Sequence, residues 1–185
     1  MNKHIYTFFS LLLAVFVSAQ SLKSYKFIDF KTPNYVLKSK AKLDIKSNKT
    51  AKQFKTVLSE NYKNGKIDFA SYYITAIWGC GLGCINGAMV DVRDGRVYDL
   101  PISEKNTVGN CFSTPYIDDQ EDRYEMNKQS ALFLTSVCTE MQTNQLNKNV
   151  QMKTYFVYVW DEKNKKFSLV KRVTKKTMID LKENN

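Results

Sequence analysis

Histidine is almost absent from this sequence. The 185 residues contain one, His4, and it lies within the N-terminal signal peptide predicted below. The rest of the chain therefore cannot form a Ser-His-Asp or Cys-His catalytic group, a histidine general base or a histidine metal ligand. No cofactor-binding or metal-binding motif is recognised, and no catalytic residue is assigned. The sequence favours a protein that is not an enzyme and leaves one hydrolase alternative open, which is described below.

Long apolar runs are also scarce. The only one spans Ile5–Val17, between Lys3 and the small residues that end at Ala19. It is shorter than the roughly 20 residues that a membrane-spanning helix needs, and it is typical of a secretory signal peptide. We expect residues 1–19 to be a signal peptide cleaved before Gln20. The mature chain is then periplasmic or extracellular, with no transmembrane segment.

Acidic residues are few in the segment 20–66, where twelve lysines accompany three acidic residues within a chain of formal net charge +10. Such a segment suits an acidic envelope or secreted protein or another anionic surface, and it is equally typical of a solvated helix face. Arginine is rare, with four in the chain. Because base reading favours arginine, and because we expect export, sequence-specific recognition of nucleic acid is disfavoured.

The same segment contains the only helix that the pattern predicts. Thr50 and Gln53 have the spacing of a capping box, and Asn64-Gly65 ends the periodic stretch. We expect an amphipathic helix over about 50–63, with its apolar stripe on a sheet. The stripe consists of Ala51, Phe54, Val57, Leu58 and Tyr62.

Strand patterns dominate from residue 67 onward. Tyr72–Trp78 is aromatic and β-branched, as in a strand that packs on both faces. A strand of alternating pattern follows at 88–92, and Asp94-Gly95 predicts a type I′ hairpin turn before the strand at 97–100. Further strands are expected at 131–138, 153–160 and 167–173, and 174–185 reads as a polar tail.

These patterns predict one small α+β domain. The N-terminal helix packs on a mostly antiparallel, five- or six-stranded meander formed by residues 67–173. Four cysteines in an exported chain indicate two disulfides that staple this domain. Sequence alone leaves three pairings open.

Part of the chain resembles a group of small exported bacterial proteins of uncharacterised function. That group has the pattern N-F-A-G-H-Y, then W-G-C-G-x-G-C, then D-x-x-T-G-K-V-Y-x-x-P. The matching residues here are Phe69, Ala70, Tyr73, Trp78, Gly79, Cys80, Gly81, Gly83, Cys84, Asp91, Gly95, Val97, Tyr98 and Pro101. The chain departs from the pattern at Ser71 and Tyr72, where the group has Gly and His.

The resemblance implies a fold but no activity. It also favours one disulfide pairing. Cys80 and Cys84 belong to the shared pattern and are expected to pair, which leaves Cys111 with Cys138, a pair outside it.

Carboxylates offer two further sites. The first is an acidic group in the long loop after Pro101, which does not match a calcium-loop spacing and is more typical of a solvated turn. Its members are Asp118, Asp119, Glu121 and Asp122. The second is the active site of a hydrolase, which would use Asp91 or a Lys-assisted serine. Backbone N–H groups of the stretch 79–84 would stabilise the oxyanion of its reaction.

Strand aromatics offer a candidate binding surface, because one helix cannot cover both faces of a sheet. Its members are Tyr72, Trp78, Tyr98, Tyr158 and Trp160. The leading hypothesis is therefore a non-enzymatic binding module, such as an inhibitor or an immunity-like protein of the envelope or secreted fraction. The alternatives are the hydrolase and a structural envelope accessory.

Overall fold

The computed structural model describes residues 25–81, 84–103, 123–143 and 148–180. Within these ranges the chain forms one 3₁₀ helix, two short α-helices and seven strands. They are η2 (Phe27–Phe30), α1 (Lys49–Gln53), α2 (Lys55–Asn64), β1 (Tyr73–Gly81), β2 (Cys84–Asp91), β3 (Val97–Asp99), β4 (Tyr124–Met126), β5 (Leu132–Gln142), β6 (Lys148–Asp161) and β7 (Lys166–Asp180).

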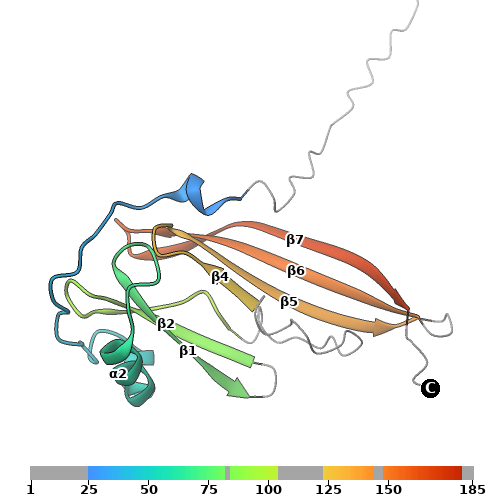
Figure 1. Ribbon diagram of the computed structural model, residues 1–185. Coiled ribbons are helices and arrows are strands. Elements are labelled where there is room, and N and C mark those ends of the chain that lie inside the picture. Colours follow the sequence, from blue (N-terminus) through green and yellow to red (C-terminus); the bar gives the residue numbers. More distant parts are fainter. Residues whose placement is uncertain (1–24, 82–83, 104–122, 144–147, 181–185) are drawn as a thin grey trace, which may run out of the picture.

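The strands form two antiparallel sheets (Figure 1). One has the order β1-β2-β3 and the other the order β4-β5-β6-β7. The prediction of mostly antiparallel strands is confirmed. The prediction of a single five- or six-stranded meander is wrong, because the described residues divide seven strands between two sheets.

The β1-β2-β3 sheet is the middle layer, and this explains why its strands are apolar on both faces. One face packs on α1 and α2 around Leu58, Tyr62, Ile74 and Val90. The opposite face packs on the second sheet, in a core that contains Phe69, Tyr73, Met89, Phe133 and Trp160. A second sheet therefore covers the face that one helix leaves open.

The helical segment is two helices instead of the single one expected over 50–63. Asn48 begins α1, because its Oδ1 accepts hydrogen bonds from the backbone N–H groups of Thr50 and Ala51. At Phe54 the backbone leaves the helical conformation, with φ −111° and ψ 34°. The Phe54 ring lies 4.7 Å from the Trp78 ring, so the break lies where the helices contact β1.

The hairpin between β2 and β3 has a longer turn than predicted. Gly95 N–H donates to the Asp91 carbonyl, and Asp91 N–H donates to the Arg96 carbonyl. Only Gly95 has a positive φ, 77°, in this turn, so the two-residue type I′ turn is wrong. Glycine is required here because a Cβ on Gly95 would lie 2.0 Å from the Lys42 carbonyl oxygen.

The second sheet is long and curved (Figure 1). β7 pairs with β6 over its whole length, with one irregularity opposite Val157/Tyr158, and it continues to Asp180. A strand thus occupies most of the stretch 174–185, where a polar tail was expected. The second sheet contributes to the core shared with the first sheet through residues at one of its ends, among them Phe133, Trp160 and Phe167.

Candidate functional site

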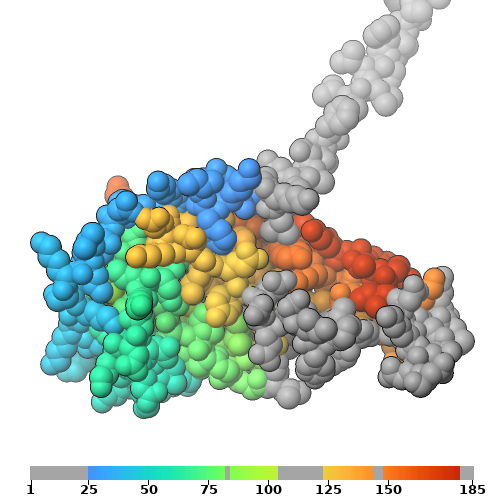
Figure 2. Space-filling view, viewed as in Figure 1, coloured from blue at the N-terminus to red at the C-terminus, as the bar shows by residue number. Residues whose placement is uncertain are grey.

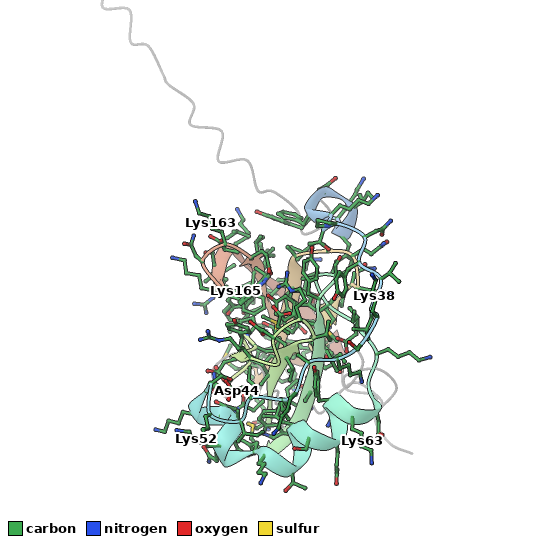
Figure 3. All side chains as sticks on the ribbon, turned by 90° about the vertical axis from the view of Figure 1, so that its left-hand side faces the viewer. Lys38, Asp44, Lys52, Lys63, Lys163 and Lys165 are labelled. Atoms are coloured by element: carbon green, nitrogen blue, oxygen red, sulfur yellow. A yellow bond between two sulfur atoms is a disulfide. The ribbon has the colours of Figure 1, made fainter. Side chains whose placement is uncertain are left out.

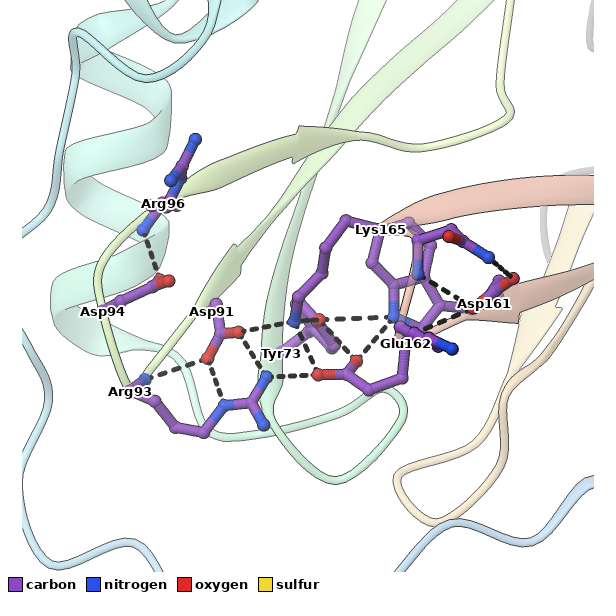
Figure 4. Close-up of polar contacts among 11 residues, drawn as sticks. Tyr73, Asp91, Arg93, Asp94, Arg96, Asp161, Glu162 and Lys165 are labelled. Carbon is purple, nitrogen blue, oxygen red and sulfur yellow. Dashed lines mark hydrogen bonds and ion pairs between the residues drawn. The ribbon is translucent and has the colours of Figure 1, made fainter.

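Charged residues from both sheets meet at one end of the molecule (Figure 4). We call this group the inter-sheet cluster: Tyr73, Asp91, Arg93, Glu162 and Lys165. Tyr73 begins β1 and Asp91 ends β2, while Arg93 lies in the turn that follows. Glu162 and Lys165 lie in the β6–β7 turn.

The fold brings these residues together from distant parts of the sequence. Arg93 and Glu162 are 69 residues apart, and Lys165 and Asp91 are 74 apart. The Asp161 side chain shapes the β6–β7 turn by accepting hydrogen bonds from the N–H groups of Lys163 and Asn164. Lys165 adopts a positive φ of 51° in this turn, and its side chain extends toward Asp91 and Tyr73 (Figure 4).

Both carboxylates of the inter-sheet cluster are held by several donors. Arg93 contacts Asp91 through two bonds, Nε to Oδ1 at 2.8 Å and Nη2 to Oδ2 at 2.5 Å. Arg93 Nη2 and Lys165 Nζ each lie 2.5 Å from Glu162 Oε1. The Tyr73 hydroxyl donates to Glu162 Oε2 at 2.7 Å. Two cations thus face two anions, and the charges balance.

Aromatic rings surround the cations. The Arg93 guanidinium lies 3.7 Å from the centre of the Tyr72 ring. Lys165 Nζ lies 5.4 Å from the Tyr73 ring and 5.6 Å from the Tyr98 ring. Trp160 Nε1 donates to Glu162 Oε2 at 2.8 Å. These rings shield the ion pairs from water and strengthen them.

The shifted pKa values in the inter-sheet cluster favour ionised Asp91 and Glu162 and a neutral Tyr73. Burial alone would raise the pKa of Asp91, but the hydrogen bonds and charges of Arg93 and Lys165 outweigh it and lower that pKa. Burial likewise opposes ionisation of Glu162, yet its donors lower its pKa to about 2. Burial and the neighbouring Glu162 raise the pKa of Tyr73 above its usual range.

This geometry suits a structural connection between the sheets. Asp91 is 1% exposed, and its two oxygens are occupied by Arg93 and Lys165. A general base needs an oxygen within reach of a substrate proton, and a nucleophile needs an open approach. Neither arrangement is present at Asp91. Arg93 and Lys165 keep side-chain exposures of 32% and 29%, so water reaches the rim.

The five aromatic residues of the candidate binding surface do not form one exposed face. Trp160 is buried, and Tyr98 and Tyr158 pack around the same core between the sheets. Tyr72 is half-buried beside Tyr35. Trp78 packs against the helices on the opposite face of β1, and its Nε1 is buried without a hydrogen-bond partner within the described residues.

One of the two predicted disulfides is present among the described residues. Cys80 and Cys84 form a disulfide where β1 meets β2, as the resemblance implied. Cys138, on β5, is disulfide-bonded as well. Cys111, its expected partner, lies outside the described residues.

The lysines of the segment 20–66 lie mostly at the surface. Within the described part of this segment every lysine is exposed except Lys40, which donates to the carbonyls of Tyr62 and Gly65 at the end of α2. Lys52 and Lys63 lie on the helices, at the lower edge of the view in Figure 3, with Lys163 and Lys165 above them.

Two other predicted sites include residues outside the described ranges. The acidic group Asp118, Asp119, Glu121 and Asp122 lies outside the described residues, and so does Gly83 of the proposed oxyanion stretch. Where the structure describes the chain, no group of three metal-ligating side chains occurs, and no helix is long and apolar enough to cross a membrane.

Sequence reasoning missed Glu162 and Lys165. They belong to the polar turn between β6 and β7, where charged residues are ordinary, so no local pattern distinguishes them. Asp91 and Arg93 had a weak signal, since an acidic and a basic residue two positions apart precede the predicted Asp94-Gly95 turn. Comparisons of this chain with protein-family models, curated proteins and solved structures find no match.

Proposed function

We propose that this protein is a non-enzymatic binding module of the cell envelope or secreted fraction. The observation that carries the proposal is the surface of the second sheet away from the inter-sheet cluster. There β7 places basic side chains beside apolar ones that remain exposed: Leu169 is 52% exposed, Val170 45% and Met178 50%. Contiguous apolar patches rimmed by polar residues mark protein-binding sites, and we propose that Leu169 and Val170 with their basic neighbours contribute to one.

The charge distribution supports a binding role over catalysis. The cations and anions of the inter-sheet cluster neutralise one another. The basic side chains of β7 make no ion pair within the described residues. The positive charges of β7 can therefore attract an acidic partner, whereas those of the inter-sheet cluster are already neutralised by Asp91 and Glu162. The hydrolase alternative gains no support from Asp91, whose oxygens are occupied.

Location outside the cytoplasm is part of the proposal. A disulfide between Cys80 and Cys84 is favoured in an oxidising compartment, in agreement with the signal peptide expected at residues 1–19. An inhibitor or immunity-like protein works by occupying another protein's surface, and a small stapled sheet provides a rigid scaffold for that task.

The test is affinity capture with the mature chain, disulfides intact, from envelope and secreted fractions of the source cell. Capture is repeated at low and high salt, with the cytosolic fraction as the control. We expect a stoichiometric partner in the envelope or secreted fraction that is weakened by salt, because surface charges are screened. Absence of any such partner, together with turnover of an envelope polymer by the pure protein, would overturn the proposal.

A further inference from the structure

We propose that the outer edge of β7 receives an acidic, extended segment of a partner protein, which joins the sheet as an additional strand. This inference rests on the binding function proposed above, and it identifies the surface and the chemistry of the partner. It begins from the position of β7 at the sheet edge.

β7 is a long and accessible edge strand. It has 15 residues and pairs on one side with β6; no other described strand pairs with it. Alternate residues of an antiparallel edge strand direct their N–H and C=O groups away from the sheet. Such a row of unused backbone groups is a template for one more strand. Figure 2 shows β7 (red) at the molecular surface.

The charges on β7 select the partner. Five basic residues and no acidic residue occur between Lys166 and Ile179. Four of them lie within six positions, two on each side of Val173-Thr174: Lys171, Arg172, Lys175 and Lys176. Arg172 lies over the Phe156 ring and Lys175 over the Tyr155 ring, but none of the four forms an ion pair among the described residues. Acidic side chains on an adjacent strand would complement them.

The same charges argue against a second copy of this chain as the occupant. If two β7 strands paired antiparallel about Val173-Thr174, Lys171 would face Lys176 and Arg172 would face Lys175. Like charges directly opposite each other are unfavourable, and lysine on an edge strand is a common protection against self-association. An acidic strand removes this repulsion.

The complement is the same in both strand directions. The pattern of two cations, two uncharged residues and two cations reads identically when reversed. An incoming strand therefore needs two acidic residues, two β-branched residues and two acidic residues, whether it runs parallel or antiparallel. The test probe is a capped peptide with the core Glu-Glu-Val-Thr-Glu-Glu.

The test separates strand addition from simple charge attraction. The full mature chain is titrated with the labelled peptide, and with the same peptide N-methylated at every residue of the core, which keeps the charge but removes the backbone donors of both strand edges. Since several backbone hydrogen bonds are lost together, we expect the N-methylated peptide to bind at least about tenfold more weakly. Amide hydrogen exchange should slow in β7 when the unmodified peptide binds. Equal affinity for the two peptides would overturn strand addition.

A pair of matched variants locates the site. Lys175→Glu with Lys176→Glu should weaken binding by at least about tenfold, because attraction becomes repulsion at two positions. Lys49→Glu with Lys55→Glu changes the net charge equally at exposed positions at the start of α1 and α2, and should change affinity less than about twofold. Equal losses in both variants would overturn the assignment to β7. Binding to phosphatidylserine vesicles with none to the peptide would overturn it as well.

Failure of this inference can be distinguished from failure of the proposed function. A captured partner that excess peptide does not displace, and that the Lys175→Glu/Lys176→Glu protein still binds, would retain the binding function and overturn the β7 site. Peptide binding as described, without a captured partner, would support the edge site and count against the proposed function.

Discussion

Asp91 is the one charged residue that is buried within the described part of the chain. Removal of water from a carboxylate is costly, and here Arg93 and Lys165 offset that cost with direct ion pairs. Burial of the charged Asp91 side chain therefore requires its ion pairs with Arg93 and Lys165.

The substitution Asp91→Asn should destabilise the protein strongly. It leaves Arg93 and Lys165 facing each other without the buried anion between them. Breaking a buried pair costs about 3–5 kcal/mol, and we expect the lower end, since Arg93 and Lys165 keep some contact with water. Urea unfolding measures the change. Asp99→Asn, at an exposed position, is the control and should cost less than about 0.5 kcal/mol. Equal stability of the two variants would contradict the ion-pair assignment.

Glu162 should make stability depend on acid pH. Its pKa falls from an ordinary 4.5 to about 2 in the folded state, so the ionised form favours folding. That contribution is complete above about pH 4.5, declines as the pH falls toward about 2, and is absent below it. Because the Glu162 side chain is 40% exposed, solvent screening reduces its size.

The variant Glu162→Gln tests this dependence. The difference in unfolding free energy between the two proteins should be largest near neutral pH and should shrink between about pH 4.5 and pH 2. Glu60→Gln, at an exposed position on α2, is the control for the removal of one surface carboxylate. A difference that stays constant from neutral to acid pH would show that Glu162 does not ionise more readily in the folded state.

At the scale of elements, the β2–β3 turn joins the first sheet to the N-terminal segment. Asp44 N–H donates to the Gly95 carbonyl at 2.9 Å, and Ala41 N–H donates to the Val92 carbonyl at 2.9 Å. The close approach of Lys42 at Gly95 leaves no room for a side chain.

Gly95→Ala should therefore be destabilising while Gly79→Ala is tolerated. At Gly95 a methyl group meets the Lys42 carbonyl, and its φ of 77° is unfavourable for alanine; together these should cost more than about 2 kcal/mol. At Gly79 a Cβ meets nothing within 4 Å, and we expect a change within about 0.5 kcal/mol. Thermal unfolding of the two variants checks the comparison. A melting temperature of Gly95→Ala equal to that of the wild type would contradict the prediction.

Ser71 is a second place where the backbone is constrained. Its φ is 67°, a region that favours glycine. The Ser71 hydroxyl lies 2.6 Å from that of Thr32. A hydrogen bond to the N-terminal segment thus accompanies the positive φ of this serine.

At the scale of the whole molecule, the inter-sheet cluster and the binding edge that we propose on β7 are at different places. The inter-sheet cluster and the shared core join the two sheets at one end. β7 continues from this end along the second sheet, beyond the part that packs on the first (Figure 1). Residues on the outer edge of β7 can thus change with little effect on the core.

The shared core predicts that both sheets unfold together. Trp78 lies on β1 and Trp160 on β6, and the chain has two tryptophans. In Trp160→Phe the fluorescence reports the first sheet, and in Trp78→Phe the second. Within each variant, the denaturation midpoint by fluorescence should coincide with that by circular dichroism. Separate transitions would contradict a single cooperative unit.

The sequence by itself determined the features that depend on local pattern. Alternation at Ala88, Val90 and Val92 indicated a strand because the side-chain period of a strand is set by its own backbone. The apolar character of both faces of β1 indicated burial on both sides. The resemblance added the pairing of Cys80 with Cys84.

Only the tertiary structure decided what depends on contacts between distant residues. The separation into two sheets follows from which strands exchange hydrogen bonds, and short patterns do not encode the partner. The meeting of Arg93 with Glu162, and of Lys165 with Asp91, joins polar turns whose sequences look solvated. The length of β7 was hidden for the same reason: an edge strand exposed to water can be built from lysine and threonine, and its strand conformation is imposed by pairing with β6.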